Sequence, residues 1–153
     1  MTTTVDQVDS EVNFVPYVYT LLATLAGRRS LVLVMDGSEV GWKCVVLMLS
    51  VIYRNPGLPI AWMVVKGSKG HFPQQTHLAL LAQVRAMIPP GADVIFVSDG
   101  EFDGTVFRAA VDGYGWHYVC RTAKNTRIGV GEDDQFPFQV VEVQPGNTRA
   151  HPR

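Results

Sequence analysis

The sequence predicts an α/β fold with a single mixed sheet, and three observations support that class. Three apolar runs at 30–36, 42–53 and 58–66 are separated by short links, which favour antiparallel neighbouring strands. A helical pattern, a fourth apolar run, a second helical pattern and a fifth run follow them. The chain has 153 residues, 47% hydrophobic and 18% charged, which is the size and composition of about one folded domain.

The helices are predicted from apolar spacing and from the residues at their ends. Apolar residues recur at helical spacing within 12–27, where Pro16 suits the first turn and Gly27 suits the end. An amphipathic helix is expected at 74–88, because its apolar residues lie near one face, and Pro-Pro-Gly is expected to end it. A shorter helix is expected at 102–111.

The remaining strands are predicted from short apolar runs at 93–98 and 115–121. The run at 93–98 resembles 30–36 in having no polar alternation, so both strands are expected to be buried on both faces. Residues 123–137 have the composition of a loop, and 138–143 is a further strand candidate.

Charge and targeting signals exclude several function classes. The net charge is −1, so there is no overall basic footprint for nucleic acid, although a local basic groove is compatible with it. The first ten residues lack the basic and apolar regions of a signal peptide. The longest apolar run, at 44–52, is far shorter than the ~20 residues of a spanning helix. A cytoplasmic protein without membrane contact is expected, with Cys44 and Cys120 as small buried hydrophobic residues.

Two aspartates, Asp36 and Asp99, each follow a predicted buried strand and each precede a glycine. An Asp-Gly pair is a common turn former, and a pair of aspartates is also a candidate metal site. The strand order is that of the ribonuclease H-like fold, in which the first and fourth strands are parallel neighbours. Their carboxylates would then lie about 5 Å apart at one edge of the sheet. Two such carboxylates stay ionised together when a cation lies between them, and Mg²⁺ (or Mn²⁺) suits oxygen ligands of this kind.

Four stretches point to one family. They are LVLVMDGSEVG, LPIAWMVVKGSKGHFPQQ, DVIFVSDGEFDG and WHYVCRTAKN, and they span residues 30 to about 125. In this order and spacing the chain resembles the catalytic domain of IS4-type DDE transposases. The resemblance implies a ribonuclease H-like fold and DNA transposition, in which three acidic residues hold two divalent metals that cut and rejoin DNA phosphodiesters.

The resemblance assigns the catalytic and metal-binding roles to Asp36 and Asp99, the first and second acids. The family's third acid is a glutamate within a downstream Tyr…Arg…Glu…Lys signature. Tyr118 and Arg121 have the spacing of its first half, but Asn125 then takes the position of the glutamate and Glu132 that of the lysine. The chain is therefore expected to end before the third acid, as a truncated copy with weak or no activity alone.

Four basic residues are candidate DNA contacts, with exposed surface charge as the alternative for each of them. Three domains are expected: an N-terminal polar segment and helix at 1–29, a partial DDE transposase domain at 30–128 and an irregular tail at 129–153. The implied partners are DNA at transposon ends and a second copy or a full-length transposase. The basic residues are Lys66, Lys69, Arg121 and Lys124.

Two other functions are compatible with parts of the sequence. A phosphatase of the haloacid dehalogenase kind also begins with a strand ending in Asp, but it requires a second Asp two residues later, where this chain has Ser38. A non-catalytic remnant that binds DNA or a full-length transposase requires no third acid. His77 and His117 have no partner at metal-ligand spacing and are expected to be structural or surface residues.

Overall fold

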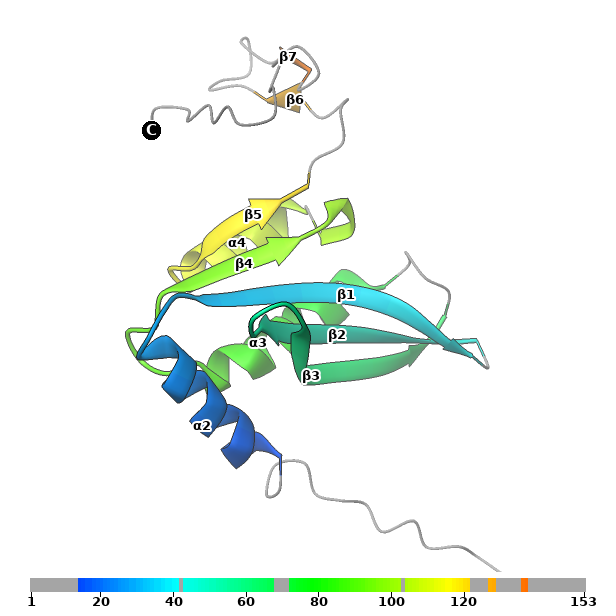
Figure 1. Ribbon diagram of the computed structural model, residues 1–153. Helices are drawn as coiled ribbons and strands as arrows, with labels where there is room; N and C mark the ends of the chain where they lie inside the picture. The colour runs from blue at the N-terminus through cyan, green and yellow to red at the C-terminus, as the bar shows by residue number, and fades with distance from the viewer. Residues whose placement is uncertain are drawn as a thin grey trace, which may run out of the picture. The chain divides into compact units, whose positions relative to one another are not determined.

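The sheet at the centre of the fold has five strands in the order β3-β2-β1-β4-β5 (Figure 1). The structure is a computed structural model, and it describes residues 14–41, 43–67, 72–102, 104–121, 127–128 and 136–137. The strands are β1 (Leu31–Gly41), β2 (Cys44–Ile52), β3 (Gly57–Lys66), β4 (Val94–Ser98) and β5 (His117–Cys120). The helices of this unit are α2 (Val15–Ala26), α3 (Gln74–Met87), the short 3-10 helix η1 (Gly100–Phe102) and α4 (Thr105–Gly113).

The pairing confirms the predicted mixed sheet. β1, β2 and β3 pair as antiparallel neighbours, and the chain then crosses through α3 to β4, which pairs in parallel with β1. A second crossover through α4 places β5 parallel to β4. Crossovers of this kind need an intervening helix, because parallel strands cannot be joined by a tight turn.

The first strand is longer than predicted. It was expected to end at Asp36, but β1 continues to Gly41 because its second half pairs with the first half of β2. The turn between the two strands includes Gly41 and Lys43, which both have positive φ angles, 87° and 57°. The prediction that Asp36 ends its strand is therefore wrong, whereas Asp99 does directly follow β4.

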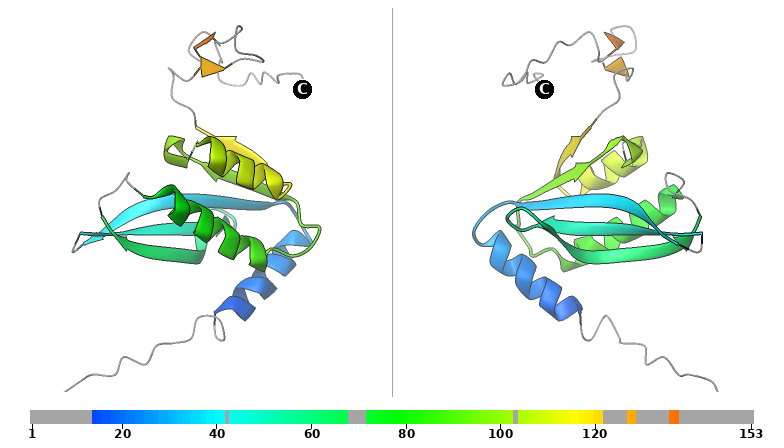
Figure 2. Two further views of the ribbon diagram at one scale, coloured as in Figure 1. Left: turned by 180° about the vertical axis from the view of Figure 1, so that it is seen from behind. Right: turned by 45° about the vertical axis from the view of Figure 1, so that its right-hand side comes forward.

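One face of the sheet packs against helices, and the other is more open. Figure 1 shows α3 and α4 behind the sheet, and the view from behind in Figure 2 places both in front of it. Leu31, Leu33 and Met35 of β1 are buried on the helix-covered face, whereas Val32 and Val34 on the opposite face are only half-buried. The expected burial of 30–36 and 93–98 on both faces is therefore wrong for the described residues, since β4 alternates in the same way.

The helices follow the local signals of the sequence with small shifts. Pro16 lies in the first turn of α2 and Gly27 caps its end, as predicted. The helix expected at 102–111 instead begins at Thr105, because residues 100–102 form η1 and Gly104 precedes the new helix. Buried side chains from α2, α3 and α4 share one core with the strands: Leu22, Leu25, Leu80, Leu81, Val84, Phe107 and Val111.

The chain divides into two compact units, Met1–Cys120 and Arg121–Arg153. This division differs from the predicted boundaries after 29 and 128, since α2 belongs to the same core as the sheet. The second unit contains a short antiparallel pair, β6 (Arg127–Ile128) and β7 (Phe136–Pro137), where only a loop was expected. The strand candidate at 138–143 lies outside the described residues. Among the described helices, none is long and apolar enough to cross a membrane.

Candidate functional site

Asp36 and Asp99 lie on neighbouring parallel strands at matching positions. The pairing of β1 with β4 runs from Leu31 opposite Val94 to Val34 opposite Val97, and each aspartate lies two residues beyond that last pair. Neighbouring strands are about 5 Å apart, so this register, if continued by two residues, would bring the two aspartates to adjacent positions. Both side chains are exposed. We call these two residues the carboxylate pair.

Strand alternation places Asp36 on the open face of the sheet, and Asp99 directly follows β4. Asp36 follows Val32 and Val34 at two-residue spacing, and Asp99 follows Ile95 and Val97 in the same way. The residues that alternate with these along β1 and β4 point to the helix-covered face. Because both side chains are exposed, the pair is accessible to solvent and to a ligand.

The backbone of Asp99 is held by two donors. The amide of Phe102 in η1 donates a hydrogen bond to the carbonyl oxygen of Asp99 at 3.2 Å. The Sγ of Cys120, at the end of β5, also donates to this carbonyl oxygen at 3.2 Å. Cys120 and Cys44 are both half-buried, rather than buried as expected.

Tyr118 anchors the loop that carries Asp99 from the buried side. Its hydroxyl donates to the carbonyl oxygen of Phe102 at 2.9 Å and accepts a hydrogen bond from the Ser98 hydroxyl at 3.2 Å. Burial is the main cause that raises the pKa of Tyr118 to about 12, so the phenol stays protonated as a donor at neutral pH. Ser98 was not predicted to have a role, although a polar residue on the buried face of 94–98 is a signal that the sequence offers.

The carboxylate pair has the ligand chemistry of a divalent metal site. Carboxylate oxygens are the hard ligands that Mg²⁺ and Mn²⁺ prefer, and Mg²⁺ keeps several waters or binds phosphate oxygens besides one or two carboxylates. Two carboxylates and a phosphate-bearing substrate therefore fit such an ion. Within the part of the chain that the structure describes, no three His, Cys, Asp or Glu side chains gather around one point.

The predicted basic residues do not join the carboxylate pair in the described structure. Across the sheet, Asp36 is opposite Met48 of β2, which is opposite Trp62 of β3. Lys66 is exposed at the end of β3, four residues beyond Trp62. At about 3.3 Å per residue, Lys66 lies well along the sheet from Asp36. Arg121 is exposed at the start of the second unit, and Lys69 and Lys124 lie outside the described residues.

The two histidines that the structure describes, His77 and His117, have different environments. His77, in α3, is only 7% exposed, and its Nε2 has no hydrogen-bond partner. Burial lowers the pKa of its imidazole, which therefore stays neutral at neutral pH. His117 is exposed in β5, where its Nε2 lies 3.6 Å from Asp93. Both fit the prediction of structural or surface residues.

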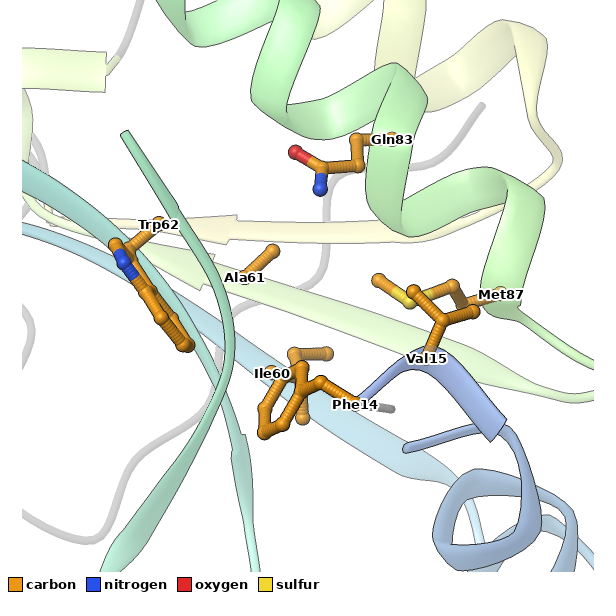
Figure 3. Close-up of a pocket in the computed structure, with 7 residues that line it drawn as sticks. All are labelled: Phe14, Val15, Ile60, Ala61, Trp62, Gln83 and Met87. Atoms are coloured by element: carbon orange, nitrogen blue, oxygen red, sulfur yellow. The ribbon is translucent and has the colours of Figure 1, made fainter. Parts of the chain in front are cut away.

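A small apolar pocket lies at the outer edge of β3, near the start of α2 (Figure 3). Its volume is about 210 Å³, and one wall is the ring of Trp62, whose centroid lies 5.4 Å from that of Phe14. Gln83 contributes the only side-chain amide among its lining residues. The lining residues are Phe14, Val15, Ile60, Ala61, Trp62, Gln83 and Met87. None of these lining residues is ionisable.

Comparisons with known proteins assign no family to the chain. A scan against models of protein families finds no match. A search of curated proteins finds no significant match either.

Proposed function

We propose that this chain is a domain of the IS4-type DDE transposase kind, with a ribonuclease H-like sheet that binds divalent metal at Asp36 and Asp99. The observation that supports this proposal most is the parallel pairing of β1 with β4, since each aspartate lies two residues beyond the last pair, Val34 and Val97. The strand order and the four stretches of sequence similarity support it as well.

The proposed chemistry is the cleavage and joining of DNA phosphodiesters. Bound Mg²⁺ or Mn²⁺ supplies Lewis-acid activation of a water or a 3′-hydroxyl and stabilises the leaving oxygen. Asp36 and Asp99 would hold the ions, while Phe102 and Cys120 fix the backbone of Asp99 through its carbonyl oxygen. The open face of the sheet gives the DNA backbone access to the pair.

A second candidate is a non-catalytic remnant that binds DNA or a full-length transposase. It is favoured by one observation: the described residues place no third metal ligand beside the carboxylate pair. The two candidates share the fold and differ in whether the purified chain turns over DNA.

The first test is calorimetric titration with Mg²⁺ and with Mn²⁺. We expect the wild-type chain to bind, and Asp36→Ala and Asp99→Ala each to lose that binding, because each removes half of the carboxylate pair. Asp112→Ala is the matched control, since Asp112 is an exposed aspartate on α4. Binding that survives both substitutions, or no binding by the wild type, would contradict the metal site.

The second test is nicking of supercoiled plasmid DNA by the purified chain. Because the described residues offer two metal ligands, we expect little or no nicking by the chain alone. Mn²⁺-dependent nicking that disappears in Asp36→Ala and persists in Asp112→Ala would favour the active enzyme over the remnant.

A further inference from the structure

The sheet by itself does not fix the spacing of the carboxylate pair. Pairing between β1 and β4 ends at Val34 and Val97, two residues before each aspartate. From there β1 follows its partner β2, while the chain after β4 turns into η1. Figure 1 shows the end of β4 pointing away from β1. Some other contact must therefore hold the two strand segments at a set distance.

Three aromatic rings in mutual contact connect the two segments from the helix-covered side. The ring of Phe72 lies against β1 so closely that a Cβ at Gly37 would be 2.7 Å from its Cε2. The ring of His77 follows at a centroid distance of 5.9 Å from Phe72. The ring of Phe102 lies 4.9 Å from that of His77, in an edge-to-face arrangement. We call Phe72, His77 and Phe102 the aromatic bracket.

Both ends of the aromatic bracket are attached directly beside an aspartate. Gly37 is the residue after Asp36, so the contact with Phe72 sets the position of β1 at the pair. Phe102 donates from its amide to the carbonyl oxygen of Asp99, and Tyr118 holds the carbonyl of Phe102. The bracket therefore joins the backbone at Asp36 to the backbone at Asp99 by continuous packing.

His77 is the middle ring of the bracket and its only polar side chain. The three rings are almost fully buried, and the Nε2 of His77 has no hydrogen-bond partner, which is costly in a buried site. Packed rings of this kind resist compression, because protein interiors are close-packed. The size of the His77 ring, which contacts both Phe72 and Phe102, therefore bears on how far apart these two rings lie.

We propose that His77 is a positioning residue whose ring, held between Phe72 and Phe102, sets the separation of Asp36 and Asp99. The inference rests on the proposed function in treating this separation as the width of a metal site. A metal ion requires its ligands at fixed distances, so a change of bracket thickness changes binding without touching either carboxylate.

The test measures the separation itself, without metal. Asp36→Cys and Asp99→Cys are combined in a Cys44→Ser, Cys120→Ser background, and the rate of disulfide formation reports the proximity of the two positions. His77→Ala empties the middle of the bracket and is expected to slow this reaction at least about tenfold, because intramolecular rates fall steeply with misplacement. His77→Phe restores a ring and is expected to return the rate to near that of the parent.

Val84→Ala is the matched control, because it shortens a fully buried side chain of the same helix, seven residues after His77. If His77→Ala fails to fold, Phe72→Leu is the second variant, because it replaces the ring at the β1 end of the bracket by a smaller side chain. It is expected to slow the reaction to an intermediate rate. Equal rates in the parent, the bracket variants and Val84→Ala would overturn the proposal. Equal slowing by the bracket variants and Val84→Ala would also overturn it, and so would a parent that forms no disulfide.

A parallel Mn²⁺ titration with both aspartates intact separates this inference from the proposed function. Weaker binding in His77→Ala, rescued by His77→Phe, supports both. If the wild type binds no metal while the disulfide rates still depend on His77, the proposed function fails and the positioning role stands.

Discussion

Gly37 is the residue at which the backbone of β1 comes closest to the core. Any side chain there would meet the ring of Phe72, which is itself buried. The need for glycine at this position is steric, because its φ angle is in the ordinary range for a strand. The Gly after Asp36 is therefore a packing requirement in this structure and not a turn signal.

Gly37→Ala is predicted to destabilise the fold by about 1–3 kcal/mol, the usual cost of overpacking a core. Urea denaturation followed by circular dichroism measures the change. Gly113→Ala is the control, because a Cβ at Gly113, the last residue of α4, meets no atom within 4 Å. Alanine is the better helix former, so Gly113→Ala is expected to be neutral or stabilising. Equal losses in both variants would contradict the steric argument.

His77 makes the stability of the fold depend on pH. Its pKa in the folded chain is lowered from 6.5 by burial, and the rings that pack against it belong to Phe72, Phe102 and Phe107, which carry no charge. Below about pH 6.5 the unfolded chain binds a proton that the folded chain binds less well. The contribution of neutral His77 is therefore complete above that pH and is lost progressively as the pH falls.

We predict that the stability difference between His77→Phe and the wild type grows in favour of the variant from pH 8 to pH 5. Phenylalanine cannot bind the proton, so this part of the acid destabilisation disappears in the variant. Urea unfolding at several pH values measures it, and all other titrating groups cancel in the comparison. Parallel pH profiles for the two proteins would show that His77 is not responsible.

At the scale of the elements, the order of the strands could be predicted from the sequence, whereas the residues at which several of them end could not. The apolar runs and the short links between them predict three antiparallel strands followed by two parallel ones. The stretch Gly37–Gly41 contains two glycines and reads as a link, yet it is a strand because β2 supplies a partner for each of its positions up to Glu39. Local propensity is overridden there by pairing with a distant segment.

The same distinction applies to the candidate site. The matching positions of Asp36 and Asp99, each two residues beyond the last pair of β1 and β4, follow from a strand order that can be predicted from sequence. The role of His77 depends on which rings of α3, η1 and the loop before α3 meet in the core. No periodicity in the sequence encodes that packing, so the histidine was expected only to be structural or exposed.

The turn between β1 and β2 carries a backbone conformation that lysine tolerates poorly. Lys43 has φ 57°, in the left-handed region, and it is exposed. An L-residue there loses roughly 1–2 kcal/mol, whereas glycine adopts the region freely.

Lys43→Gly is predicted to raise the free energy of unfolding by about 0.5–1 kcal/mol, since glycine regains part of this cost. The midpoint of thermal unfolding is the readout. Lys66→Gly provides the comparison, because Lys66 is an exposed lysine in a regular strand, where glycine is expected to cost about 0.5–1 kcal/mol. A loss of stability in both variants would argue against strain at the turn.

At the scale of the whole unit, α2 is part of the sheet's core rather than a separate N-terminal segment. Its residues Val18, Leu22 and Leu25 are buried with those of β1 and α3. The opposite side of the helix is exposed, as at Tyr17, which is 77% accessible to solvent. The helix thus contributes to the stability of a site to which it supplies no ligand.

Leu22→Ala is predicted to cost about 2–5 kcal/mol, because it leaves a cavity at a fully buried position. Tyr17→Ala, on the exposed side of the same helix, is expected to change stability by less than about 0.5 kcal/mol. Chemical denaturation of both variants measures the contrast. Similar values for the two would show that α2 does not belong to the core.

The parallel pairing of β1 with β4 also has a consequence for how the protein acquires its site. The β1-β2-β3 meander consists of contacts between segments close in sequence, whereas β2, β3 and α3 all intervene before β4 can join β1. Local contacts form quickly, and pairings between distant segments must first overcome the entropy of closing a long loop. During refolding, the meander is therefore expected to gain its amide protection before Asp99 comes to lie beside Asp36, so a ligand for the carboxylate pair would meet its site only in the last stage of folding.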